Sequence, residues 1–282
     1  MKNNLRMLGL ALCMLPMYLH AETQQDMERA YQPAQEHHAQ SANVIPAGTI
    51  IPLRLNSALR SDKGRSGEAI TATVMQDVPL ATGETLPAGS KVTGHVVQAI
   101  ASGRGSDEPS ISFQFDQLQL GTQAIPITTN LRAVASRSAV FAATPLPDSP
   151  DHADNQVQIG GDQISYGSDG PVTVGSQVVG KYTNQGVLAS VRQGTQCGGN
   201  ALDTNYHPQA LWLFSVNACG AYGFGDLTIL HSGRTEPLGE VTLTSHGKAV
   251  NVGKGSAMLV RIDDGRDEEA QSRTTSSRGT GQ

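Results

Sequence analysis

The polar residues best suited to chemistry lie in one segment, between residues 198 and 207. Asp203, Asn205 and His207 stand at alternate positions there and offer oxygen and nitrogen ligands. The segment lacks the sixth-position glycine and the twelfth-position acid of an EF-hand calcium loop. The chain also has no Gly-x-Ser-x-Gly motif before a helical pattern and no glycine-rich loop with a phosphate-binding lysine. We therefore predict a polar loop, with no catalytic residue, no metal ligand and no cofactor.

The chain has three cysteines. Cys13 lies in the N-terminal region, and Cys197 and Cys219 lie beyond it. In an exported protein an isolated pair most simply forms a disulfide. A zinc or redox site is the alternative, but such sites usually contain close pairs such as Cys-x-x-Cys. We predict a Cys197–Cys219 bond that ties the polar loop to the end of the apolar strand 211–214. That strand holds Trp212, the only tryptophan, which we expect to be buried.

The N-terminal region indicates export. Lys2 and Arg6 precede an apolar run from Met7 to Leu19, which is followed by a small-residue cleavage site ending at Ala21. The run is too short for a membrane-spanning helix, which needs about 20 apolar residues. We predict a signal peptide, no transmembrane helix in the mature chain, and a location in the periplasm, at the outer membrane or outside the cell. The formal net charge of −5 argues against nucleic acid as a partner, since nucleic acid attracts clustered Lys and Arg.

A repeated turn organises the chain. Pro46-Ala47-Gly48 recurs as Pro87-Ala88-Gly89, and residues 253–256 are a fainter echo. Proline sets φ at the first corner of the turn, and glycine supplies the positive φ that a type II turn needs. We therefore predict structural turns at Pro46, Gly48, Pro87 and Gly89, each of which starts a strand.

Apolar and polar residues alternate after these turns, as in half-buried strands. Ile51, Leu53 and Leu55 share one predicted face. The alternation slips at Asp116–Gln117, which predicts a β-bulge. Short strands of this kind must close over a core. We predict an all-β fold, a small barrel or sandwich of many short strands, with a second disulfide-tied β half.

Changes in composition divide the chain into six parts. Stretches without an apolar face are predicted to be flexible, and the proline- and acid-rich stretch is predicted to be a linker or long loop. The second β half either completes the same barrel or forms another domain. The parts are a signal peptide (1–21), a flexible polar arm (22–43), a first β unit (44–134), the linker (135–156), the second β half (157–262) and a disordered tail (263–282).

Residues 44–97 resemble a known family. The segments that carry the likeness are Ala47–Leu53, Asn56–Asp62, Gly67–Val74, Leu86–Ser90 and Gly94. They are similar to the TrbI-type β-barrel domain of scaffold subunits in bacterial type IV secretion and conjugation systems. The resemblance implies a barrel in the periplasm or at the outer membrane that is built into an assembly and is not a catalyst. Residues 197–262 have no clear counterpart in that family.

Three functions fit these observations. The first is an exported, non-enzymatic β-barrel scaffold or interaction protein of the bacterial cell envelope, whose partners are envelope proteins or further copies of itself. The second is a secreted polysaccharide-binding module, which exposed aromatic stripes would favour. The third is a hydrolase, which would need a deep polar pocket with a pair of carboxylates. The expected burial of Trp212 favours the first function over the second.

Overall fold

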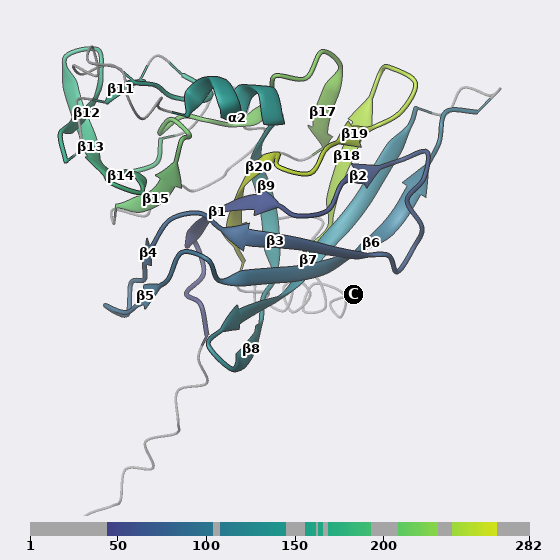
Figure 1. Ribbon diagram of the computed structural model, residues 1–282, viewed down its shortest axis with the longest axis horizontal. Coiled ribbons are helices and arrows are strands. Elements are labelled where there is room, and N and C mark those ends of the chain that lie inside the picture. The colour runs from purple at the N-terminus through teal and green to yellow at the C-terminus, as the bar shows by residue number, and fades with distance from the viewer. Residues whose placement is uncertain are drawn as a thin grey trace, which may run out of the picture. The chain divides into compact units, whose positions relative to one another are not determined.

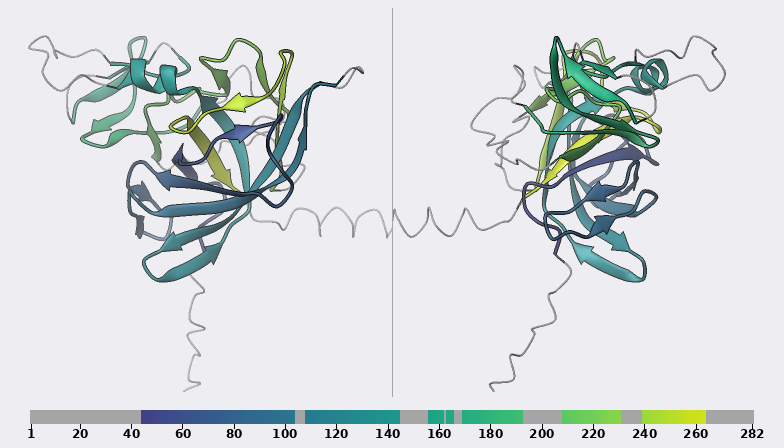
Figure 2. Two further views of the ribbon diagram at one scale, coloured as in Figure 1. Left: turned by 45° about the vertical axis from the view of Figure 1, so that its right-hand side comes forward. Right: turned by 90° about the vertical axis from the view of Figure 1, so that its left-hand side faces the viewer.

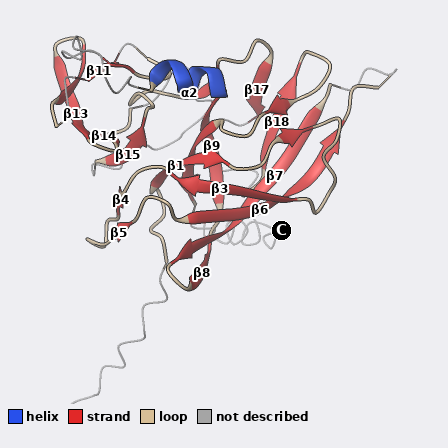
Figure 3. Ribbon diagram, viewed as in Figure 1, coloured by secondary structure: helices blue, strands red, loops and turns tan. Residues whose placement is uncertain are grey.

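The computed structural model describes residues 44–103, 108–144, 156–161, 163–165, 169–192, 208–230 and 239–263. The predicted signal peptide and polar arm lie outside this part, as does the predicted tail beyond residue 263. Apart from one seven-residue helix, α2 (Arg137–Ala143), the regular structure of the described part is β-strand (Figure 3). The all-β prediction is therefore confirmed. No helix in the described ranges is long and apolar enough to cross a membrane.

Ten strands form one sheet that curls into a nearly closed barrel (Figure 1). The strands at its two ends, β16 and β17, follow one another in the chain and are separated only by residues 223–226. β8 (Gln123–Pro126) pairs with β7 beside the main path. The order along the sheet is β16 (Gly220–Tyr222), β9 (Thr129–Ala135), β20 (Ala257–Ile262), β1 (Ile50–Leu55), β3 (Ala69–Val74), β6 (Lys91–Ile100), β7 (Ser110–Leu120), β18 (Val241–Ser245) and β17 (Leu227–Leu230).

The segment predicted as a linker does not separate two independent β units. Strands β16, β17, β18 and β20 come from beyond residue 157, yet they lie in the same sheet as the strands before it. Six further strands form a second, antiparallel sheet (Figure 2). Its order is β10 (Gln156–Val157), β11 (Gln163–Ser165), β12 (Pro171–Val174), β13 (Gln177–Thr183), β14 (Gly186–Ala189) and β15 (Gln209–Trp212). The chain thus leaves the barrel, builds the smaller sheet and returns.

Three neighbouring barrel strands, β1, β9 and β20, carry a hydrophobic core on each face. In β1, Leu53 packs into the barrel interior, while Ile50 packs into the core under the smaller sheet. In β20, Met258 and Leu259 divide between the two cores in the same way. β9 is likewise covered on both faces, with Leu131 and Val134 in the barrel core and Ala133 and Ala135 in the other. It is buried at every position, although its sequence also contains Thr129, Asn130 and Arg132.

The predicted bulge is confirmed on β7. Thr93 of β6 pairs with Gln117, but the next residue, Gly94, pairs with Phe115. Asp116 is therefore the extra residue on the bulged strand. Two short ribbons complete the described structure: β2 (Leu59–Arg60) with β19 (Asn251–Val252), and β4 (Val78–Pro79) with β5 (Thr85–Leu86).

The repeated turn occurs four times and closes strand pairs in the same way each time. In the first copy Thr49 N–H donates to the Pro46 carbonyl, and Gly48 has a φ of 81°. Gly48 N–H and the Thr49 carbonyl then form a reciprocal pair of hydrogen bonds, 2.8 and 2.9 Å, with Ile262 on β20. The turns are Pro46–Thr49, Arg65–Glu68, Pro87–Ser90 and Gly253–Ser256, and their reciprocal partners are Ile262, Val96, Val74 and Leu55.

These turns brace two antiparallel pairs, β1 with β20 and β3 with β6. One turn begins each of the four strands, so each pair is held by a turn at either end. Gly89 has a φ of 86°, the conformation that the Pro-Ala-Gly pattern predicts. The Arg65–Glu68 turn has no proline, and only Ser66-Gly67 marks it in the sequence.

Glutamine side chains join the smaller sheet to the barrel. Gln76 is 1% exposed, and its Nε2 donates to the Val187 carbonyl while its Oε1 accepts from Trp212 N–H at 2.7 Å. Gln209 Oε1 accepts from Ile50 N–H at 2.9 Å. Trp212 is 7% exposed, as expected, and has a positive φ of 50°, which a bulky residue rarely adopts. The Gln76 bond therefore holds the backbone in a conformation that tryptophan does not favour.

Candidate functional site

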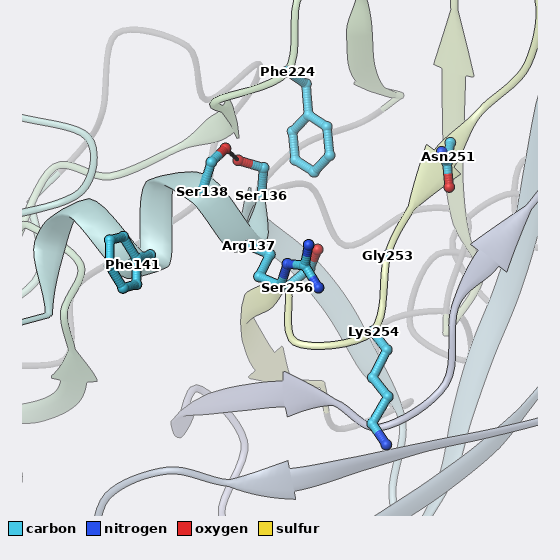
Figure 4. A pocket seen from close by; sticks show the side chains of 9 residues that line it. All are labelled: Ser136, Arg137, Ser138, Phe141, Phe224, Asn251, Gly253, Lys254 and Ser256. Carbon is cyan, nitrogen blue, oxygen red and sulfur yellow. Dashed lines mark hydrogen bonds between the residues drawn. The ribbon is translucent and has the colours of Figure 1, made fainter.

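A pocket of about 630 Å³ lies where three neighbouring barrel strands end together (Figure 4). Ala135 of β9 is paired with Tyr222 of β16 on one side and with Ala257 of β20 on the other. Beyond this row, β9 continues into α2, β16 continues to Phe224, and β20 is preceded by the turn Gly253–Ser256. The register of these three strands therefore positions the three walls of the pocket. The pocket volume lies in the range typical of ligand sites.

Helix α2 forms the first wall. Ser136 caps it, because its Oγ accepts a hydrogen bond from Ala139 N–H at 3.1 Å. The sequence that follows is rich in alanine, and Pro145 lies beyond the end of the helix at Ala143. Val140 is buried against the core, whereas the Phe141 ring is 76% exposed at the pocket. Because the surrounding proline- and acid-rich composition suggested a loop, this helix was not predicted.

Two exposed cations line the pocket, Arg137 on α2 and Lys254 on the turn before β20. Neither forms an ion pair or hydrogen bond with another described residue. The Arg137 stem lies over the turn, with its Cδ 3.4 Å from the position a Cβ on Gly255 would occupy. In Figure 4 the Lys254 side chain extends away from α2 and from the Arg137 guanidinium. No carboxylate is among the lining residues that the structure describes.

Ser256 lines the pocket and differs from its counterparts in the other turns. The Thr49 hydroxyl donates to the Pro46 carbonyl at 2.6 Å, and the Ser90 hydroxyl donates to the Pro87 carbonyl at 2.7 Å. Ser256 occupies the same turn position and is 1% exposed, yet its Oγ has no hydrogen-bond partner in the described structure. A buried hydroxyl normally has a hydrogen-bond partner, so Ser256 is an exception. Its proton is therefore available to a ligand.

The other lining residues are apolar or weakly polar. Phe224 supplies a half-buried ring from the segment between β16 and β17, and Asn251 of β19 supplies an amide. The Ser136 and Ser138 hydroxyls bond each other at 2.8 Å. Cations and hydroxyl protons beside aromatic rings suit an anionic ligand that also carries apolar surface. Nothing in this set of lining residues is a carboxylate, histidine or cysteine that would transfer a proton or form a covalent intermediate.

Two histidine–carboxylate pairs lie elsewhere on the surface. His95 Nδ1 is 2.8 Å from Asp116 Oδ2, at the bulge on β7, and His246 Nδ1 is 2.9 Å from Glu108 Oε1. All four side chains are more than a third exposed. Among the described residues no group of three or more His, Cys, Asp or Glu is arranged to hold a metal ion. We interpret both pairs as solvated surface contacts.

The structure places the sequence-predicted residues in three ways. Pro46, Gly48, Pro87 and Gly89 lie in bracing turns away from the pocket. Cys219 is 1% exposed and directly precedes β16. Cys197 and the polar loop with Asp203, Asn205 and His207 lie outside the described residues, so the disulfide stays a prediction.

Sequence reasoning missed the pocket, because its residues come from three distant segments. The available signal was the Gly253–Ser256 copy of the turn, in which glycine replaces proline and lysine replaces alanine. No family model and no curated protein sequence matches the chain.

Proposed function

We propose that this chain is a non-enzymatic β-barrel scaffold or interaction module of the bacterial cell envelope. The observation that carries the proposal is the pocket at the ends of β9, β16 and β20. It holds two aromatic rings and two cations that pair with no described residue. Among its described lining residues there is no carboxylate, histidine or cysteine, and no serine is hydrogen-bonded to a base. Such a site binds a ligand without transforming it.

Two features of the sequence support the envelope location. The apolar run before Ala21 has the length and flanking residues of a signal peptide. The resemblance of residues 44–97 to the TrbI-type barrel domain agrees with a role inside an envelope assembly. On this proposal the protein works in the periplasm, at the outer membrane or outside the cell, with envelope proteins or its own copies as partners.

The experiment is cross-linking in the native envelope, followed by purification of the mature protein. We expect discrete higher-mass species that contain this chain. We also expect no turnover above background with ester, peptide, glycoside or phosphate substrates. Turnover that disappears when Asp203, Asn205 and His207 are all changed to alanine would contradict the proposal and place a catalytic site in the polar loop.

A further inference from the structure

We propose that the pocket between α2, Phe224 and the Gly253–Ser256 turn binds an acidic peptide segment of a partner protein, in which an apolar side chain lies next to Asp or Glu. The inference rests on the proposed role as an interaction module and identifies the surface and the chemistry of the partner. The pocket's two cations stand on a chain whose formal net charge is −5. A local positive site on an acidic protein attracts anionic segments of a partner.

The aromatic rings decide between a small anion and a peptide. A free phosphate or carboxylate ion would use Arg137 and Lys254 and would leave the exposed Phe141 ring and the half-buried Phe224 ring in water. A peptide with an apolar side chain beside its carboxylate covers a ring and pairs with a cation at once. The pocket volume of about 630 Å³ also exceeds what a single small anion fills.

Ser256 gives independent support. Its buried hydroxyl lacks a partner, although Thr49 and Ser90 satisfy the same position with a bond to the carbonyl at the start of their turns. A ligand carboxylate that draws the Arg137 side chain off this turn gives the Ser256 hydroxyl an acceptor. Arg137 then contributes charge-assisted hydrogen bonds and Ser256 contributes a directed one.

The donor and acceptor inventory disfavours a polysaccharide as the occupant. Sugar hydroxyls need acceptors as well as donors, and carboxylates are the strongest acceptors. Among the described lining residues the two cations only donate, Asn251 carries the one side-chain carbonyl, and the remaining side-chain acceptors are neutral serine hydroxyls. An acidic peptide presents acceptors to these donors, which is the better match.

The test uses purified mature protein and fluorescein-labelled synthetic peptides of fifteen residues, measured by fluorescence anisotropy. One peptide set places Leu or Phe beside Asp–Glu pairs, a second replaces the acids with Asn and Gln, and a third replaces the apolar residues with Ser. We expect binding of the first set only, and binding that weakens as salt is added, because exposed charges are screened. Inorganic phosphate and polygalacturonate are the competing probes.

Charge reversal locates the site. The double variant Arg137→Glu, Lys254→Glu should weaken binding of the first peptide set by about tenfold or more. The matched control, Lys91→Glu with Lys181→Glu, makes the same change in net charge at exposed positions on β6 and β13 and should bind as wild type. Ser256→Ala keeps every charge and should weaken binding by a smaller factor without lowering the melting temperature, because the hydroxyl has no partner to lose.

Several outcomes would overturn the inference. These are equal binding by the charge-reversed variant, a preference for polygalacturonate or phosphate over all peptides, and no peptide binding by the wild type. A failure of the peptide-binding inference can be told apart from a failure of the proposed scaffold function. If the charge-reversed variant still gives the wild-type cross-linked species in the envelope, the module acts through another surface. If the wild type gives no discrete species, the module itself is in question.

Discussion

The barrel and the smaller sheet are held in place by different chemical groups. In the barrel, the pairs β1 with β20 and β3 with β6 are braced by backbone bonds from four copies of one turn. The smaller sheet is attached by side-chain amides instead, with Gln76 bonded to Val187 and Trp212, and Gln209 bonded to Ile50. Gln163 of β11 accepts from Val216 N–H at 2.8 Å, in the segment that connects β15 to β16. Backbone bracing survives most substitutions, whereas each amide joint depends on one residue.

This difference predicts that damage inside the barrel spreads further than equal damage in the smaller sheet. A Cβ on Gly94 would lie 1.9 Å from the Gln114 carbonyl oxygen across the β6–β7 pair, and a Cβ on Gly180 would lie 2.3 Å from the Leu188 carbonyl oxygen. Both clashes involve backbone, but only the first lies inside the barrel sheet. We therefore expect Gly94→Val to cost about 3 kcal/mol or more and to unfold the whole described part.

Gly180→Val is the comparison variant. We expect it to disturb β13 and β14 while the barrel keeps its protection in hydrogen exchange measured by mass spectrometry. If Gly180→Val removes barrel protection as completely as Gly94→Val, the two sheets fold as one cooperative unit and the contrast between them is wrong.

The predicted disulfide is a covalent link whose loss can be compared in the barrel and in the smaller sheet. A Cys197–Cys219 bond would close a loop of about 22 residues, for which the chain-entropy model gives roughly 3 kcal/mol. Cys219 directly precedes β16, which pairs with β9 in the barrel. We therefore expect Cys219→Ser to destabilise the barrel as well as the smaller sheet. The measurements are intact mass with and without reductant, followed by thermal unfolding. Two free thiols in exported material would contradict the bond.

Gln76→Ala isolates the amide joint. It leaves the Trp212 N–H and the Val187 carbonyl without their partner in a buried setting, so we expect a loss of about 2 kcal/mol. The control is Gln185→Ala, since Gln185 bonds Asp77 N–H in an exposed position where water replaces the amide. Tryptophan fluorescence should change in the Gln76 variant and stay unchanged in the control. Equal effects on stability would show that burial of the joint is unimportant.

Much of the barrel was predictable, because backbone conformation leaves a local mark in the sequence. Pro-Ala-Gly requires a turn, and the slip at Asp116–Gln117 requires a bulge, and both are found. The Arg65–Glu68 turn was missed because its sequence shares only the glycine with the other copies. The linker prediction was wrong for residues 137–143, where the Ser136 cap and the alanine-rich sequence form a helix.

The joint and the pocket were not predictable, because their residues meet only in the folded chain. Glutamine usually lies on surfaces, so nothing local marks Gln76 as a buried link between two sheets. Arg137 and Lys254 are over a hundred positions apart and become neighbours through the pairing of β9 with β20. The burial of β9 on both faces was also hidden, because Thr129, Asn130 and Arg132 interrupt its apolar residues.

The smallest expected effects come from two tyrosines, one in each region. Burial raises the pKa of Tyr222 on β16 and of Tyr182 on β13 above the ordinary value of about 10. The Tyr222 hydroxyl also accepts from Cys219 N–H and donates to the Cys219 carbonyl, both at 2.8 Å. No described residue bonds the Tyr182 hydroxyl. At neutral pH we expect Tyr222→Phe to cost about 1 kcal/mol and Tyr182→Phe to cost almost nothing.

At alkaline pH both substitutions should raise stability relative to wild type. A pKa raised in the folded state means that the unfolded chain ionises first, so stability is complete below about pH 10 and falls as the pH rises through the folded-state pKa. Phenylalanine removes that loss, and each variant should therefore gain relative to wild type between about pH 9.5 and 11. Denaturant unfolding at pH 7 and pH 10.5 measures both effects. The contrary result is a Tyr222→Phe variant whose loss of stability relative to wild type is as large at pH 10.5 as at pH 7. Burial would then not control the ionisation of Tyr222. The β16 end of the barrel would be more open to water than the core under the smaller sheet.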